Sequence, residues 1–170
     1  IGVLNGLADL AGRVGLDLPG FLAAIERIVH GTTVATNALL EGKGAKVGLL
    51  TTQGHRDVLE MRTENRFEQY DLSLVLPKPL IPREDRFPVK GRIDAQGREL
   101  QALDEAALEA LADVIGERGF GAVAIGFIHS YMNPAHEERA REILSRKLSI
   151  PISISSEVSP QMREFERFNT

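Results

Sequence analysis

The residues best suited to bind an anion lie together in one short segment, residues 30–41, which reads HGTTVATNALLE. If a strand ends at His30 and a helix begins after Thr33, the turn between them presents backbone N–H groups and the hydroxyls of Thr32 and Thr33 to one point. Phosphate oxygens accept hydrogen bonds from both kinds of donor. A simpler interpretation is that one threonine caps the helix and His30 is buried, and the spacing alone favours it.

A second turn of similar composition follows the next apolar stretch. Residues 47–50 (VGLL) are typical of a buried strand, and residues 51–54 (TTQG) are predicted to form the turn after it. Ligands of open α/β sheets bind at the carboxyl ends of strands, so this turn is a second candidate for the same site. Arg56, Asp57 and Arg62 could add charge there, although an exposed ion pair on a short helix explains them more simply.

Three other motifs do not meet the requirements of the sites they suggest. Residues 41–44 (EGKG) lack the first glycine and the hydroxyl residue of a P-loop. His136 has no second histidine one helical turn away, and His129 lies too far along the chain to complete a zinc-binding pair. Ser130 is not part of a Gly-x-Ser-x-Gly elbow and fits a polar cluster at a strand end. The sequence therefore indicates no metal site and identifies no catalytic residue.

The composition is that of a globular domain with no preference for nucleic acid. The chain has 170 residues, 43% of them hydrophobic, and carries 20 Lys and Arg against 24 Asp and Glu, a net charge of −4. It lacks the basic excess that binds a phosphate backbone, contains no cysteine, and has no apolar run long enough to span a bilayer. We expect a cytoplasmic protein without nucleic-acid or membrane partners, cut from a longer chain at both ends.

Strands alternate with helices along the chain, which predicts an α/β fold in a single domain over residues 1–170. Helices are predicted over residues 3–16, 34–41, 55–61, 104–119 and 133–147. Buried strands are predicted over residues 28–30, 47–50, 122–128 and 152–155.

The middle of the chain is predicted to be irregular. Four of the eight prolines lie between Pro77 and Pro88, which favours an extended excursion from about 63 to 86. Loops of this length usually carry function or form a contact surface. After it, residues 87–93 and Leu100 are predicted to form a hairpin that turns at residues 94–97.

Several ordered segments together resemble the hydantoinase A/5-oxoprolinase family, which includes acetone and acetophenone carboxylase subunits. These segments are residues 30–41 (HGTTVATNALLE), 44–52 (GAKVGLLTT), 56–60 (RDVLE), 79–83 (PLIPR), 129–137 (HSYMNPAHE) and 155–160 (SSEVSP). The resemblance covers nearly the whole chain in order. It is therefore far more specific than any one short motif.

The resemblance implies part of an actin/Hsp70-like (ribonuclease H-like) ATPase domain, with a mixed sheet and helices on both faces. In the family, a glycine- and threonine-rich phosphate-binding hairpin precedes the helix that we place at residues 3–16. That first hairpin and the second ATPase domain are missing from this chain. We therefore expect the fragment alone to be inactive.

The resemblance also implies an ATP- and Mg²⁺-dependent reaction on a cyclic amide of the hydantoin or 5-oxoproline type. An amide is a poor electrophile because of its resonance, and phosphorylation of its oxygen would allow water to attack the carbon. On this interpretation eight residues line the phosphate or substrate side of the cleft, namely His30, Gly31, Thr32, Thr33, Asn37, Thr51, Thr52 and Gly54.

Three alternatives remain open at the level of the sequence. The complete protein could carboxylate a ketone such as acetone or acetophenone, or transfer phosphate to a stable product as sugar and acetate kinases do. The segment could instead build an interface, with the excursion over residues 63–86 as the contact surface. The resemblance implies a hydantoinase B-like subunit or domain as partner, within an oligomer.

Overall fold

The computed structural model describes residues 2–29, 31–63, 68 and 70–169. These residues divide into two compact units, Ile1–Glu41 and Gly42–Thr170, and each unit is described by itself. The prediction that residues 1–170 form a single α/β domain stays a prediction.

The first unit contains three helices, α1 (Gly2–Arg13), α2 (Leu18–Ala24) and α3 (Val34–Leu40). The helix α1 carries its apolar residues at helical spacing, and Ala11 is its one buried residue. Asp17 caps α2 by accepting a hydrogen bond from the backbone N–H of Gly20 at 2.9 Å. The predicted helices over residues 3–16 and 34–41 are therefore confirmed to within a few residues.

The predicted buried strand over residues 28–30 is wrong for its described part. Ile28 and Val29 belong to no strand, and Val29 is 86% exposed. A strand needs a neighbour for its backbone hydrogen bonds, and the described residues of the first unit contain no other strand to supply one. His30 lies outside the described residues.

The second unit is built on a four-stranded sheet in the order β2-β1-β5-β6. Its strands are β1 (Val47–Thr52), β2 (Arg86–Val89), β5 (Ala122–Gly126) and β6 (Ile152–Ile154). All three pairings between them are parallel, with Leu50 opposite Phe87 on one side and Ile125 on the other. The α/β prediction is thus confirmed, but the sheet in the described residues is parallel rather than mixed.

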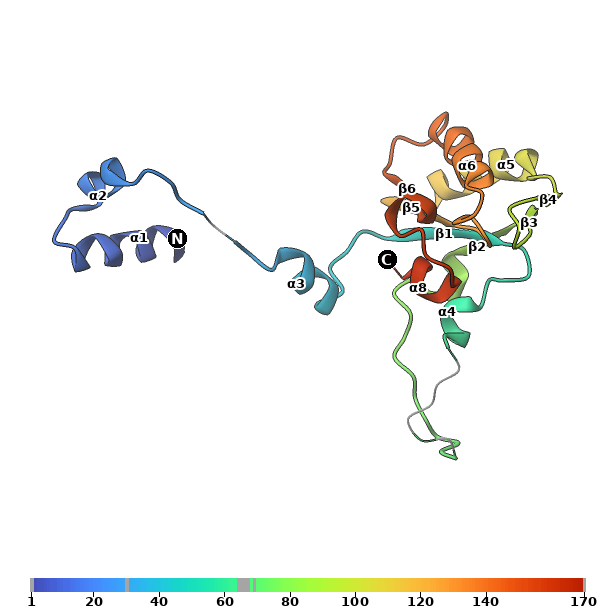
Figure 1. Cartoon of the computed structure of the whole chain (residues 1–170), viewed down its shortest axis with the longest axis horizontal. Coiled ribbons are helices and arrows are strands. Elements are labelled where there is room, and N and C mark those ends of the chain that lie inside the picture. The colour runs from blue at the N-terminus through green and yellow to red at the C-terminus, as the bar shows by residue number, and fades with distance from the viewer. Residues whose placement is uncertain (1, 30, 64–67, 69, 170) are drawn as a thin grey trace. The chain divides into compact units, whose positions relative to one another are not determined.

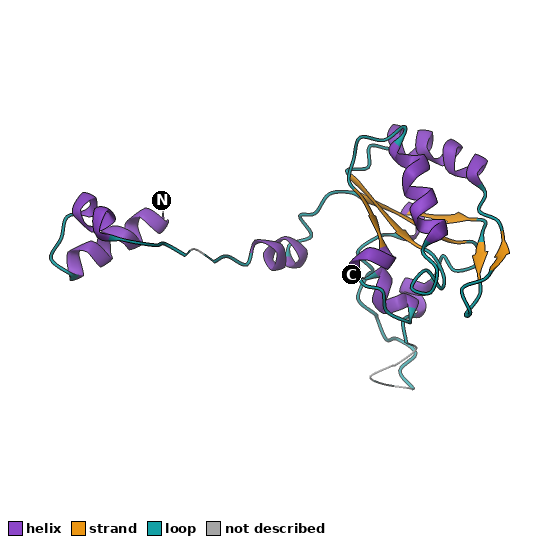
Figure 2. Cartoon of the chain, turned by 45° about the horizontal axis from the view of Figure 1, so that its top comes forward, coloured by secondary structure: helices purple, strands orange, loops and turns teal. Residues whose placement is uncertain are grey.

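Helices cover both faces of this sheet (Figure 1). On one face lie α5 (Glu105–Glu117) and α6 (Ala135–Ser145), and on the other lie α4 (Val58–Met61) and α8 (Glu164–Phe168). A short helix, α7 (Ser155–Val158), follows β6 directly. The layered arrangement of helix, sheet and helix is visible again in Figure 2.

The main core lies between the sheet and the pair α5 and α6. It is formed by apolar side chains that alternate along the strands and by one face of each helix, including Leu50, Val123, Ile125, Ile154, Leu108, Ala112, Ile115, Ala140, Ile143 and Leu144. Asp104 begins α5 by accepting a hydrogen bond from the N–H of Ala107 at 3.0 Å, and Gly119 ends the turn after it at a φ of 67°. Both signals were readable from the sequence.

The hairpin forms later in the chain than predicted. It consists of β3 (Arg92–Ile93) and β4 (Glu99–Gln101), which pair antiparallel across the expected turn at residues 94–97. Residues 86–89 instead join the main sheet as β2, because β1 offers them a parallel partner along their whole length.

The excursion over residues 63–86 contains one short 3-10 helix, η1 (Arg83–Asp85), and runs directly into β2. No other helix or strand occurs in it among the residues that the structure describes. Across the same described residues, no helix is both long enough and apolar enough to cross a membrane.

Gly126 allows α8 to approach the sheet. A Cβ atom at this position would lie 2.5 Å from two ring carbons of Phe168. We expect Gly126→Ala to lower the free energy of unfolding by about 1–3 kcal/mol because the ring must move. The measurement is the midpoint of urea unfolding.

The control for this substitution is Gly116→Ala, in the last turn of α5, where the nearest atom to an added Cβ is 3.8 Å away. This change introduces no clash and should not lower the free energy of unfolding, since alanine favours a helix over glycine. Equal midpoints for Gly126→Ala and the wild type would contradict the packing described for Phe168.

Candidate functional site

The candidate residues of the first unit lie on an exposed surface. Gly31, Thr32, Thr33 and Asn37 are all exposed, the first three before α3 and Asn37 within it. Thr33 occupies the position before the helix, yet its side chain makes no capping hydrogen bond. Its hydroxyl is therefore not used by the helix, and the simpler explanation of this threonine as a cap does not hold.

The candidate residues of the second unit lie at the carboxyl end of β1. Thr51 and Thr52 belong to the strand rather than to a turn, and they are only 1% and 4% exposed. The turn is shorter than predicted and contains Gly54, which is exposed and adopts a φ of 88°. This left-handed conformation favours glycine, so Gly54 has a structural reason to be there.

Both buried threonines use their hydroxyls inside the protein. Thr51 Oγ1 donates to the carbonyl oxygen of His55 at 3.4 Å, and Thr52 Oγ1 accepts from the N–H of Ile128 at 3.1 Å. The second contact links the end of β1 to the segment that follows β5. These hydroxyls therefore hold the ends of two neighbouring strands in place.

A buried carboxylate that the sequence analysis did not single out lies beside these strand ends. Glu137, in the first turn of α6, is 0% exposed and accepts four hydrogen bonds. The donors are the N–H of Phe127 at 2.8 Å, the hydroxyl of Ser155 at 2.6 Å, and the N–H and hydroxyl of Ser156 at 2.9 and 2.7 Å. One side chain thereby joins the ends of β5 and β6.

Arg167, which is 2% exposed, completes this network from α8. Its Nε donates to the hydroxyl of Ser155 at 3.0 Å and one Nη donates to the carbonyl oxygen of Phe127 at 2.8 Å. Ser130 joins through a hydroxyl contact with Ser155 at 3.2 Å, which confirms the strand-end polar cluster predicted for it. The carboxylate of Glu137 and the guanidinium of Arg167 therefore both form hydrogen bonds with the hydroxyl of Ser155, and all three residues are buried.

The sequence offered only a weak signal for this network. Glu137 reads as one of two acids that favour a helix N-terminus, and nothing in the spacing separates it from its exposed neighbour Glu138. Its burial follows from tertiary packing. The one available hint was that Glu137 and the pair Ser155-Ser156 all lie in segments that carry the family resemblance.

Arginines attach the end of the excursion to α4 and the turn before it. Arg86, which is buried, forms an ion pair with Glu60 and donates to the carbonyl oxygen of Ile81. Arg83 pairs with Asp57 at 2.6 Å, and this hydrogen bond holds the pKa of Asp57 below its usual value. The charges near α4 therefore have structural partners, but the partner of Asp57 is Arg83 of η1 and not an arginine of the same short helix, as the simpler interpretation had predicted.

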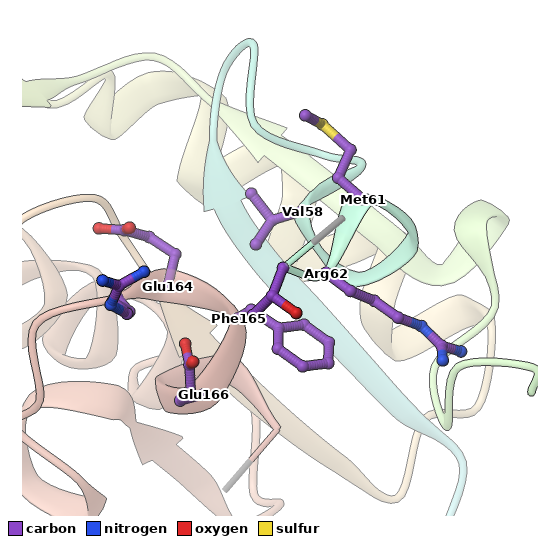
Figure 3. Close-up of a pocket in the computed structure, with 8 residues that line it drawn as sticks. Val58, Met61, Arg62, Glu164, Phe165 and Glu166 are labelled. Carbon is purple, nitrogen blue, oxygen red and sulfur yellow. The ribbon is translucent and has the colours of Figure 1, made fainter. Parts of the chain in front are cut away.

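A pocket of about 240 Å³ lies between α4 and α8 (Figure 3). The residues that line it and are labelled in the figure are Val58, Met61, Arg62, Glu164, Phe165 and Glu166. It combines an apolar floor with charged groups of both signs. Among the described residues, no group of three or more His, Cys, Asp or Glu side chains is placed to hold a metal ion.

Comparison with known proteins gives a consistent result along the whole chain. The sequence model of the hydantoinase/oxoprolinase N-terminal region matches residues 1–148. The chain is 40% identical to the caprolactamase subunit alpha of Pseudomonas jessenii over 173 residues, which cover 100% of this chain and 25% of that protein. It is 33% identical to the acetophenone carboxylase gamma subunit of Aromatoleum aromaticum over 184 residues, again 100% of this chain and 25% of the relative.

A solved structure agrees with these sequence matches. The crystal structure of the ATP-dependent caprolactamase from Pseudomonas jessenii superposes with a TM-score of 0.83 at 41% identity, over 96% of this chain and 24% of that one. The chain thus spans about a quarter of the length of the relatives it matches. Over that quarter, both the order of its motifs and its fold show that this chain belongs to the hydantoinase/oxoprolinase family and corresponds to the family's N-terminal region.

Proposed function

We propose that the chain forms part of a cytoplasmic, ATP-dependent hydrolase of cyclic amides. The observation that carries this proposal is the 40% identity to a caprolactamase subunit along the entire chain. The acetophenone carboxylase subunit is less similar, at 33% over the same extent. The identities therefore favour the opening of a lactam ring over the carboxylation of a ketone.

The proposed reaction consumes one ATP and two waters for each amide bond. The amide oxygen attacks the γ-phosphorus, ADP leaves, and the phosphorylated amide loses the resonance that protected its carbon. Water then adds to this carbon, the C–N bond breaks as the nitrogen takes up a proton, and the opened ring carries an acyl phosphate. A second water hydrolyses this acyl phosphate, so the products are the ring-opened acid, ADP and inorganic phosphate.

Within this proposal, the exposed hydroxyls of Thr32 and Thr33 contact phosphate or substrate oxygens, together with the N–H of Gly31 and the amide of Asn37. These groups suit an oxyanion, because neutral hydroxyl and N–H groups donate hydrogen bonds to its negatively charged oxygens. His30 keeps the same proposed role. In the part of the chain that the structure describes, no group of three or more His, Cys, Asp or Glu side chains is placed to hold a metal ion, and the proposal assigns no residue to Mg²⁺.

At the end of β1, Gly54 is the remaining candidate for direct contact, through its backbone. Thr51 and Thr52 keep their place in the proposal as residues of the same strand end, although their hydroxyls have the intramolecular partners described above. Their contribution to the site is then to fix the position of the turn at Gly54.

The test is product analysis with the complete enzyme and its proposed hydantoinase B-like partner. Caprolactam, 5-oxoproline and hydantoin are each supplied with ATP, and acetophenone is supplied with ATP and bicarbonate. We expect at least one cyclic amide to give its ring-opened acid with one ADP per amide, and no product without ATP. Carboxylated ketone as the only product would assign the protein to the carboxylases, and ADP release without any amide product would also reject the proposal.

The interface-building alternative has one observation in its favour. The excursion presents exposed apolar side chains at Tyr70, Leu72 and Val75, all more than four-fifths exposed. The names of both relatives above describe subunits, which fits a protein with partner chains. If the assembled enzyme hydrolyses an amide, this surface serves only to assemble the subunits, and interface building is not the main function of the segment.

A further inference from the structure

A second cluster of polar side chains lies at the carboxyl ends of β1 and β5, separate from the buried network around Glu137. It consists of His55, which follows β1, His129, which follows β5, and Arg92 on β3. All three side chains belong to half-buried residues. The carboxyl ends of parallel strands are the edge at which ligands bind in open α/β sheets.

Arg92 is the unusual member of this cluster. Most arginines described here pair with a carboxylate, but Arg92 forms no ion pair within the described part of the chain. Its one recorded side-chain contact joins Nη1 to Nε2 of His55 at 3.3 Å. A guanidinium has five N–H donors, so most of its hydrogen-bonding capacity remains unused in this half-buried position.

The contact with Arg92 fixes where the proton of His55 must lie. A guanidinium can only donate, so Nε2 of His55 accepts and the ring proton is on Nδ1. That Nδ1 is buried and has no hydrogen-bond partner. A buried ring N–H without a partner is rare in folded proteins.

His129 is the third member of the cluster. Its Nδ1 donates to the carbonyl oxygen of Ile93 at 2.9 Å, so Nε2 is an acceptor in the neutral ring and becomes a donor only when the ring is protonated. The backbone of His129 adopts a φ of 57°, which is uncommon for a residue other than glycine. Such strained conformations cluster at functional sites because the surrounding structure must hold them.

The electrostatics of the cluster favour a negative charge beside His55 and Arg92. Burial lowers the pKa of His55, and the charge of Arg92 and the nearby His129 lower it further, whereas the Glu164 carboxylate opposes this shift. Glu164 is the acidic group that approaches from α8, but it lies 3.5 Å from the guanidinium of Arg167. Among the described residues, the guanidinium of Arg92 therefore has no carboxylate bound to it and lies in a cluster with two imidazoles.

We propose that Arg92, His55 and His129 form a binding site for an oxyanion, a phosphate or carboxylate group of a reactant. Arg92 supplies the charge and a planar pair of N–H donors, which match two oxygens of either group. When both rings are protonated, each imidazole donates to the anion through Nε2, which in His55 is the nitrogen that faces Arg92. The inference rests on the geometry of the second unit alone and stands whether or not the proposed amide hydrolysis is correct.

The test uses the 170-residue chain and follows the imidazole signals of His55 and His129 by NMR across a pH titration. Inorganic phosphate and acetate are added separately, with sodium chloride at equal ionic strength as the control for screening. We expect a bound anion to raise the pKa of His55 by about one unit, because an opposite charge within a few ångströms favours the protonated ring. Chloride should leave it unchanged.

The variant Arg92→Gln should weaken anion binding roughly tenfold or more, because a hydrogen bond to a charged group is lost. Arg92→Lys keeps the charge but not the planar pair of donors, and should weaken binding less. Arg98→Gln is the matched control, since Arg98 lies on the same hairpin but pairs with Asp94 at 2.7 Å. The amide spectrum of each variant reports whether it is folded, and Arg92→Lys replaces Arg92→Gln if the latter is not.

The two anions distinguish the source of the ligand. A response to phosphate alone supports a phosphate-bearing reactant such as the nucleotide, and a response to acetate alone supports a carboxylate-bearing substrate. A response to both supports a general oxyanion site. No response to either anion, or an equal response in Arg92→Gln and the wild type, overturns the proposal.

Discussion

Replacing Thr32 and Thr33 by valine in the complete enzyme is expected to lower its ATPase turnover about a hundredfold. Valine keeps the shape of threonine but removes the hydroxyl, and removal of one well-placed donor to a developing oxyanion typically costs 10²–10³ in turnover, so about a hundredfold is a low estimate for two. Thr33 makes no capping hydrogen bond, so its replacement removes no cap from α3. Steady-state release of ADP at saturating amide is the measurement.

Two controls separate chemistry from folding in this experiment. Thr36→Val makes the same replacement at an exposed position inside α3 and should leave turnover within about twofold of the wild type, since surface changes have small effects. Thr32→Ser and Thr33→Ser keep the hydroxyls and should retain most of the turnover. Unchanged turnover in the double valine variant would remove these two residues from the proposed site.

Replacing Glu137 by alanine is expected to lower the free energy of unfolding by about 3 kcal/mol or more. The change leaves four donors from three residues without their acceptor in a buried place, and each unsatisfied group costs about 1–3 kcal/mol before relaxation or water entry reduces the sum. Glu137→Gln keeps one acceptor oxygen and should cost about half as much. Unfolding in urea, followed by circular dichroism, provides the values.

The neighbouring residue gives the matched control for this prediction. Glu138 lies in the same helical turn but is exposed, so Glu138→Ala should change stability by no more than about 0.5 kcal/mol. Similar losses for the two alanine variants would mean that the charge near the start of α6 matters and that the strand-end network does not.

The parts of the fold that the sequence predicted well are those set by local patterns. The cap at Asp104, the left-handed Gly119 and the apolar run at the start of β5 each act within a few residues, and each fixes an element that the structure confirms. The turn at residues 94–97 was placed correctly for the same reason. Local chemistry sufficed in these cases.

The errors arose where partners distant in the sequence decide the outcome. Residues 86–89 form a strand of the main sheet because β1 lies beside them, and Thr51 and Thr52 are buried because β2 and β5 flank the end of β1. Ile28 and Val29 show the reverse, since an apolar pair without a neighbouring strand stays outside any sheet. The pattern of a single segment does not reveal which distant strand it will pair with.

The same limit applies to the candidate site. The exposed threonines of the first unit were selected by their spacing, whereas Glu137, Arg167 and Arg92 were missed because their partners lie up to 40 residues away along the chain. A charged residue becomes informative only when its burial and its partners are known. The prediction of site residues from sequence was therefore confined to those whose neighbours are adjacent in the chain.

The order of strands in the sheet has a consequence for synthesis on the ribosome. The inner strand β1 is translated early, but its neighbour β5 begins only at Ala122, and the arginine that ties the strand ends together is Arg167. Contacts between such distant segments make folding slow, since a long loop must close before they form. We therefore expect β1 to remain paired on one side only, with β2, until β5 has emerged, and its apolar side chains to be prone to aggregation during that interval.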